Sequence, residues 1–190
     1  MQHNVKEYLK SFNLLSENDI DEFIKLSTSR VLKKGQHFIT QGEICYEVCF
    51  IKSGLLRSYY YSTEKREAIT SCFYFSNTFL TAYSSLISGL PSPESIEALS
   101  DIEMLSISKT NFSALEKNNI SWLKFSKFIS EQEYLALEKR IHLLQSESAE
   151  TKYNYLLKNH SGYLQHIPLK YLASYLGITQ RHLSRIRRSI

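Results

Sequence analysis

Cysteine is scarce in this 190-residue sequence, which contains only Cys45, Cys49 and Cys72. Three thiols do not make a disulfide framework and are too few for the four thiolates of an iron–sulfur cluster, so we expect reduced cysteines in a cytoplasmic protein. Glycine and proline are also rare, with 6 and 3 copies, which excludes collagen-like and linker-dominated chains. No apolar run approaches the ~20 residues of a membrane-spanning helix, and the first residues lack the apolar stretch of a signal peptide.

Acidic residues are absent from residues 151–190, a segment that carries seven lysines and arginines. The formal net charge of the chain is +4, so residues 1–150 carry −3. A slightly acidic body with a strongly basic end is typical of contact with nucleic acid, or with an anionic membrane surface. Because these charges lie within a patterned apolar sequence, we favour nucleic acid as the partner and expect no membrane.

Histidine is sparse where an enzyme of the cupin type would need it, since His37 is the only one between Arg30 and Ser108. A metal site with two or three histidines therefore cannot form in that region. The sequence also lacks a glycine-rich phosphate loop and a nucleophile elbow. We accordingly expect no catalytic residue, no metal and no cofactor, and we expect that the protein is not an enzyme.

The residues that are present indicate a helical start followed by many short strands. Residues 4–28 are predicted to be helical, with Ser16 as an N-cap followed by acidic residues. From Arg30 to Ile107, short β-prone runs alternate with turn signals, at residues 31–32, 37–39, 48–51, 55–61, 68–75, 96–99 and 104–107. Strands this short and numerous, with no helices between them, predict an antiparallel jelly roll.

A long helix is predicted next, because residues 120–145 contain neither glycine nor proline; Thr110 can cap a shorter helix before it. Within the long helix, apolar residues spaced three, four and three apart form a narrow stripe: Tyr134, Leu137, Ile141 and Leu144. This spacing suits pairing with a second copy of the helix and predicts a homodimer. The alternative is that the stripe packs on its own domain.

Residues 167–190 carry the most specific pattern. Pro168 suits the start of a helix, and apolar residues at i, i+3, i+4 and i+7 give that helix one apolar face: Leu169, Leu172, Ala173 and Leu176. Gly177 can end it in the left-handed conformation, and Thr179 can cap a second helix. The inner face of the second helix is formed by Leu183 and Ile186. This pattern predicts a helix-turn-helix, with a generic helical hairpin as the weaker alternative.

The outer face of the second helix follows from a rotation of ~100° per residue. Opposite the buried side lie three arginines with a serine beside them: Arg181, Arg185, Arg188 and Ser184. Guanidinium groups on an exposed face can bind guanine edges or phosphates; the alternative is a solvated arginine face. Gln180 lies near the helix start, where a recognition helix enters the groove, whereas Arg187 lies close to the buried side. Candidate phosphate contacts are Lys170 and the amides around Thr179.

In this order, a β-rich domain, a long helix and a helix-turn-helix resemble the Crp/Fnr family of bacterial transcription regulators. Lys33-Lys34-Gly35-Gln36 and Ile51-Lys52-Ser53-Gly54 are similar to that family's cyclic-nucleotide-binding-like jelly roll, and residues 171–179 followed by 183–186 are similar to its helix-turn-helix. The resemblance implies an α+β fold with a jelly-roll sensor domain at residues 1–118, a dimerisation helix at 119–146 and a DNA-binding domain at 147–190. It also implies a homodimer on a two-fold-related DNA site, with RNA polymerase as a further partner. One departure matters, because Gln180-Arg181 replaces the family's Arg-Glu, so a different base sequence should be read.

A cyclic nucleotide is not the expected effector. Relatives of this kind hold the ligand with a Gly-Glu pair and an Arg-Ser pair, and the matching positions here are Leu80-Thr81 and Glu94-Ser95. No arginine lies between Glu67 and Lys139, so a cyclic phosphate lacks its cationic partner unless Arg140 reaches inward from the long helix.

A degenerate pocket would be lined by aromatic and polar side chains, with the alternative that the aromatic ones belong to the core. Its candidate residues are Phe73, Phe79, Leu80, Thr81, Tyr83, Glu94 and Ser95. The function that these patterns favour is DNA-binding transcription regulation by a homodimer that senses another small molecule or none. The alternative is a small-molecule-binding jelly-roll module without DNA-binding activity.

Overall fold

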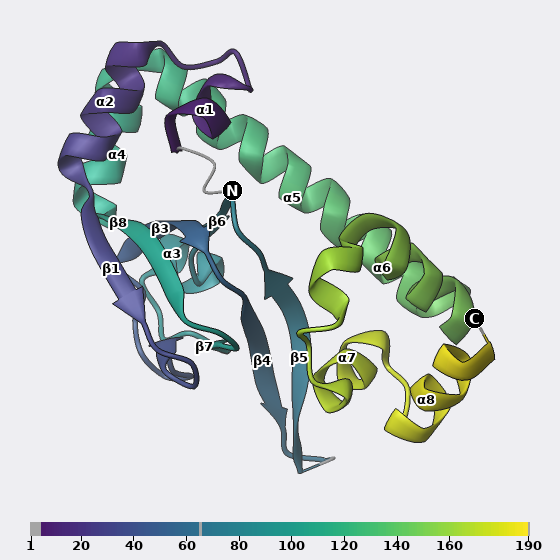
Figure 1. Ribbon diagram of the computed structural model, residues 1–190. Coiled ribbons are helices and arrows are strands. Elements are labelled where there is room, and N and C mark those ends of the chain that lie inside the picture. The colour runs from purple at the N-terminus through teal and green to yellow at the C-terminus, as the bar shows by residue number, and fades with distance from the viewer. Residues whose placement is uncertain (1–4, 65, 190) are drawn as a thin grey trace.

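The computed structural model describes residues 5–64 and 66–189, and Figure 1 shows the order of their elements. Two short helices, α1 (Val5–Lys10) and α2 (Glu17–Leu26), precede the strands. The side chain of Ser16 accepts a hydrogen bond from the Asp19 amide at 3.2 Å, and the Asp19 carboxylate accepts one from the Ser16 amide at 2.8 Å. This capping box confirms the predicted N-cap. The helical prediction extended too far, because its last residue, Thr28, begins a strand, whereas its first residue, Asn4, lies outside the described residues.

The strands form two four-stranded antiparallel sheets. The first sheet has the order β1 (Thr28–Leu32), β8 (Ile102–Ser108), β3 (Glu47–Ser53) and β6 (Thr78–Leu80). The second has the order β2 (His37–Ile39), β7 (Ser95–Ala98), β4 (Leu56–Ser62) and β5 (Glu67–Tyr74). This is the strand order of a jelly roll, so the predicted antiparallel β architecture is confirmed.

Strand β3 shows how alternation divides the interior. Cys49 and Ile51 lie in the core between the two sheets, whereas Val48 and Phe50 point to the opposite face and join a second core. The second core also contains Trp122 and residues of α1 and α2. Period-two alternation puts successive side chains on opposite faces, so one strand supports both cores.

Among the described residues, one short helix interrupts the strands, and five helices follow the last strand. Helix α3 (Tyr83–Ser88) lies between β6 and β7; α4 (Lys109–Asn118) and the 27-residue α5 (Ile120–Ser146) follow β8. The C-terminal region contains α6 (Ala149–Leu164), α7 (Leu169–Leu176) and α8 (Gln180–Ser189). The predicted long helix is therefore present. The predicted cap Thr110 is wrong, because Ser108 accepts the hydrogen bond from Asn111 N–H at 3.2 Å and α4 begins earlier. No described helix combines the length and the apolar character needed to cross a membrane.

The C-terminal helices share a third core with the sheets. Leu172, Leu176 and Leu183 are buried in one cluster with Leu55 and Phe73 of the β region. Gly177 ends α7 with φ of 70°, and the amide of Ile178 bonds the carbonyl of Ala173 at 3.0 Å. The predicted left-handed end of this helix is thus present.

Gly54 has a geometry that only glycine accepts. Its φ is 108°, and a Cβ at this position would lie 2.5 Å from the carbonyl oxygen of Asp101. We expect Gly54→Ala to lower the free energy of unfolding by about 3 kcal/mol, since backbone strain and a clash add.

Urea unfolding measures this loss against a matched control. Gly42 has φ of 93°, but a Cβ at this position would meet only open space, so Gly42→Ala reports strain alone, at about 1 kcal/mol. Equal losses in the two variants would show that the close approach to Asp101 costs nothing.

Candidate nucleic-acid interface

Helix α8 separates a buried face from a basic one. Leu183 and Ile186 are buried in the third core, while Arg181, Arg185 and Arg188 are exposed. We call these three residues the arginine face. Within the part of the chain that the structure describes, none of the three forms a salt bridge with a carboxylate. Three unpaired guanidinium groups on one side of a helix can bind phosphates or base edges.

Polar groups flank the start of α8. The Thr179 hydroxyl accepts a hydrogen bond from the His182 amide at 3.2 Å, so the predicted cap is present. Gln180 is exposed at the first residue of the helix, and Ser184 is half-buried beside the arginine face. The unsatisfied amides of a helix start favour an anion.

Lys170 and Arg187 have aromatic neighbours. The Nζ atom of Lys170 lies 4.6 Å from the ring centroid of Tyr171, on α7. The guanidinium carbon of Arg187 lies 5.6 Å from the ring centroid of Tyr153 on α6, although Arg187 is exposed rather than close to the buried side. Pro168 immediately precedes α7 as its N-cap, whereas the sequence predicted it at the first position of the helix.

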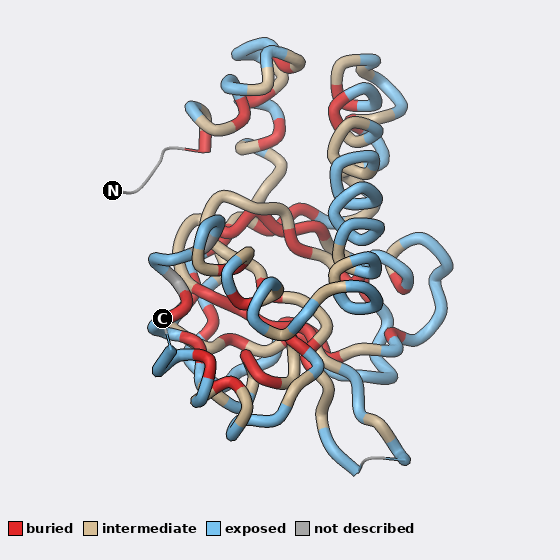
Figure 2. Tube along the Cα trace, turned by 90° about the vertical axis from the view of Figure 1, so that its right-hand side faces the viewer, coloured by how far each residue is buried: buried red, intermediate tan, exposed pale blue. Residues whose placement is uncertain are grey.

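The predicted apolar stripe of α5 is exposed in the single chain. Tyr134 and Leu137 keep 67% and 57% of their surface accessible, and Ile141 keeps 54%. Leu144 is less exposed, at 39%, because it lies close to the end of α7. One of its methyl carbons is 3.8 Å from the position that a Cβ at residue 177 would take. The central part of α5, residues 131–139, is exposed (Figure 2). The stripe therefore does not pack on its own domain in this structure.

The predicted pocket residues do not line one cavity. Leu80 is fully buried between the sheets, Phe79 packs against Phe50 at a centroid distance of 5.4 Å, and Phe73 packs against Tyr175 at 5.1 Å. These three side chains belong to three different hydrophobic clusters.

Three polar members of that set have hydrogen-bond partners. The Thr81 hydroxyl donates to the carbonyl of Glu47 at 3.0 Å, and the Ser95 hydroxyl accepts from the Gln41 amide at 2.9 Å. Tyr83 is exposed, with its hydroxyl 3.1 Å from that of Ser130 on α5. Glu94 is half-buried.

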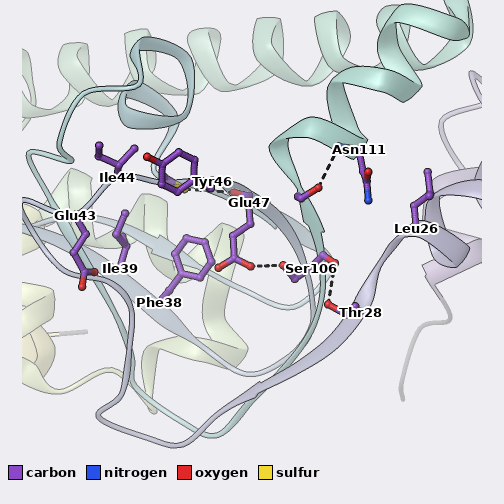
Figure 3. A pocket seen from close by; sticks show the side chains of 12 residues that line it. Leu26, Thr28, Phe38, Ile39, Glu43, Ile44, Tyr46, Glu47, Ser106 and Asn111 are labelled. Atoms are coloured by element: carbon purple, nitrogen blue, oxygen red, sulfur yellow. Dashed lines mark hydrogen bonds between the residues drawn. The ribbon is translucent and has the colours of Figure 1, made fainter.

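A cavity of about 630 Å³ lies elsewhere, at one end of the sandwich (Figure 3). It is lined by residues that the sequence reasoning did not select, among them Phe38, Cys45, Glu47 and Ser106. Glu47 forms an ion pair with Arg30 and accepts a hydrogen bond from the Ser106 hydroxyl. The alternation of β3 places Glu47 on the same face as Cys49 and Ile51, and this pattern in the sequence could have predicted that Glu47 points into the sandwich.

Cys72 on β5 lies near both acidic and basic side chains. Burial raises the pKa of the Cys72 thiol to about 12, and the carboxylates of Glu133 and Glu94 add to this rise, while Arg140 opposes it. Arg140 binds α7, since its Nη2 donates a hydrogen bond to the carbonyl of Tyr175 at 3.1 Å. Among the described residues, no group of three or more His, Cys, Asp or Glu side chains could hold a metal ion.

The β region is similar to a family of known domains. Residues 29–119 match the family "Cyclic nucleotide-binding domain". This match spans almost all of the two sheets. No curated protein matches the sequence of the chain.

Solved structures share the fold of nearly the whole chain. FixK2 from Bradyrhizobium japonicum is 16% identical with a TM-score of 0.76, covering 86% of this chain and 83% of that one. A protein from Eubacterium rectale assigned to the Crp/Fnr family is 20% identical with a TM-score of 0.73, covering 96% and 87%. A mutant of CooA from Carboxydothermus hydrogenoformans is 16% identical with a TM-score of 0.73, covering 100% and 84%. The resemblance to the Crp/Fnr family is thus confirmed at the level of the fold, which nearly the whole chain shares with these structures.

Proposed function

We propose that this chain is a cytoplasmic transcription regulator that binds double-stranded DNA as a homodimer. The observation that carries this proposal is the exposed, unpaired arginine face of α8, in a C-terminal segment that contains no acidic residue. Residues 1–118 then form the sensor domain, residues 119–146 the dimerisation helix, and residues 147–190 the helix-turn-helix domain. A regulator of this kind acts without catalysis of its own and works with RNA polymerase.

The proposed contacts divide by type. Arg181, Ser184 and Arg185 contact base edges in the major groove, because they occupy the outer side of the recognition helix α8. Gln180 and Arg188 contact the DNA at the two ends of this set of base contacts. Phosphate contacts come from Lys170 and from the amides around Thr179, and these position the helix without reading sequence.

The proposed dimer forms through the stripe of α5. An exposed row of large apolar side chains is costly in water, and a second copy of the same helix covers it with a complementary row. Two-fold pairing of this helix presents two copies of α8, which matches a two-fold-related DNA site.

We expect no binding of cyclic AMP. A buried cyclic phosphate needs a compensating cation, and Glu94 occupies the matching position while Arg140 is bonded to Tyr175. Calorimetry at millimolar cyclic AMP should give no saturable heat with the wild type. Micromolar binding that is lost in Arg140→Ala would contradict this expectation and would show that the long helix supplies the missing charge.

Competition binding to genomic DNA fragments tests the proposed function. The protein should retain a small set of fragments against a large excess of random duplex, and its affinity should fall steeply with salt because several phosphates are contacted. A variant with Arg181, Arg185 and Arg188 all replaced by alanine serves as the control and should retain none. Failure of the wild type to select any fragment would favour the small-molecule-binding module instead.

A further inference from the structure

Helix α7 rests on the jelly roll of its own chain. It lies beside β5 in Figure 1, and Phe73 of β5 is buried in the same cluster as Leu172 and Ala173 of α7. The first helix of the proposed helix-turn-helix therefore contacts the sheet as well as the neighbouring helices α6 and α8. How α7 sits on the sheet decides the direction in which α8 points.

Arg57 of β4 lies at the centre of this contact. Only 4% of its surface is exposed, which is unusual for an arginine. Its Nε donates to the carboxylate of Glu97 at 2.6 Å, and its Nη1 donates to the hydroxyl of Thr70 at 3.1 Å. Both partners belong to the sheet, so the positive charge of Arg57 is compensated without any contribution from α7.

The same guanidinium lies over two rings from different parts of the chain. Its central carbon lies 3.4 Å from the ring centroid of Tyr171 on α7 and 4.3 Å from that of Tyr59 on β4. Cation–π attraction is stronger when the cation is shielded from water, as Arg57 is. Lysine cannot reproduce this stacking, because its ammonium has no planar face.

Two further contacts hold α7 on the same side. The amide of Thr70 donates to the hydroxyl of Ser174 at 3.0 Å, and the ring centroids of Phe73 and Tyr175 are 5.1 Å apart. Thr70 therefore binds Arg57 through its side chain and α7 through its backbone.

The arginine face stays exposed while α7 is docked. Docking therefore fixes the direction of α8 without covering the surface that binds DNA. A dimer on a two-fold site needs this, because its two recognition helices must match half-sites about 34 Å apart.

We propose that Arg57 is a positioning residue for DNA binding: in contact with the rings of Tyr59 and Tyr171, it docks α7 on the jelly roll and sets the orientation of α8. This inference rests on the proposed function for its effect on DNA, but the docking itself is testable without DNA. Arg57 touches no base or phosphate in this scheme and acts through Tyr171.

The docking is tested by a distance measurement within one chain. Spin labels at Gln41→Cys and Ser189→Cys, two exposed positions, report the distance between the sheet and α8 in dimers diluted with unlabelled chain. The wild type and Tyr171→Phe, which keeps the ring, should give one narrow distance distribution. Tyr171→Leu and Arg57→Lys should broaden it, and Ser174→Ala should broaden it less. A narrow distribution in Tyr171→Leu, with the wild-type fold by circular dichroism, would overturn the proposal.

The consequence for DNA is tested on full and half sites. Tyr171→Leu should bind a full two-fold site about tenfold more weakly than Tyr171→Phe, while both bind a single half-site equally. Unchanged or tighter binding of the full site by Tyr171→Leu would overturn the positioning role. Absence of any selective DNA binding by the wild type would instead contradict the proposed function, while the distance measurement still decides the docking.

Discussion

Replacement of both Leu137 and Ile141 by glutamate is expected to convert the protein from a dimer to a monomer. Each chain would lose two of the apolar side chains that the proposed interface buries, and four carboxylates would meet across the dimer axis. Burial of one such side chain stabilises by about 1.5–3 kcal/mol. The dimer loses four such side chains, so the loss is at least about 6 kcal/mol, or roughly a ten-thousandfold rise in Kd.

Light scattering measures the mass, and the near-ultraviolet spectrum reports whether Trp122 remains buried in its core. Leu135→Glu is the matched control, since Leu135 is also exposed but lies on another side of α5, about 140° from the stripe. The control should stay dimeric. A double variant of unchanged dimer mass would mean that the chains associate through another surface.

Arg185→Ala is expected to remove most of the sequence selectivity of DNA binding. Arg185 is exposed in the middle of the arginine face, and loss of a bidentate contact to a base edge costs about 1–3 kcal/mol per half-site. Affinities for a selected fragment and for random duplex, measured at the same salt concentration, separate base reading from phosphate contact.

Arg187→Ala controls for loss of charge on the same helix. Because Arg187 lies over the ring of Tyr153, this variant should lose little selectivity. If Arg185→Ala lost the same affinity for selected and for random DNA, Arg185 would contact a phosphate and would not read a base.

Local patterns sufficed for much of the fold. The capping box at Ser16, the left-handed Gly177 and the long helix after Asn119 depend on neighbours within a few residues. Strand β6 and helix α3, which have three and six residues, were not predicted. Such short elements are held by their surroundings more than by their own propensity.

The sites that depend on distant parts of the chain were harder to predict. The cavity around Glu47 joins side chains from several strands, and the aromatic residues Phe73 and Phe79 could not be assigned to separate cores from their spacing. The stacking of Arg57 on Tyr171 joins β4 to α7. Only three-dimensional packing brings such pairs together, whereas the arginine face of α8 follows from one helical period.

Footprinting of the wild-type protein on a selected genomic fragment tests sequence-selective binding by the dimer most directly. If two copies of α8 read the major groove, two protected segments related by two-fold symmetry should appear, with centres about 34 Å or one helical turn apart, or a multiple of it. The bound complex should contain two chains. Uniform protection along the fragment, or equal occupancy of a scrambled sequence, would contradict a DNA-reading role for this helix.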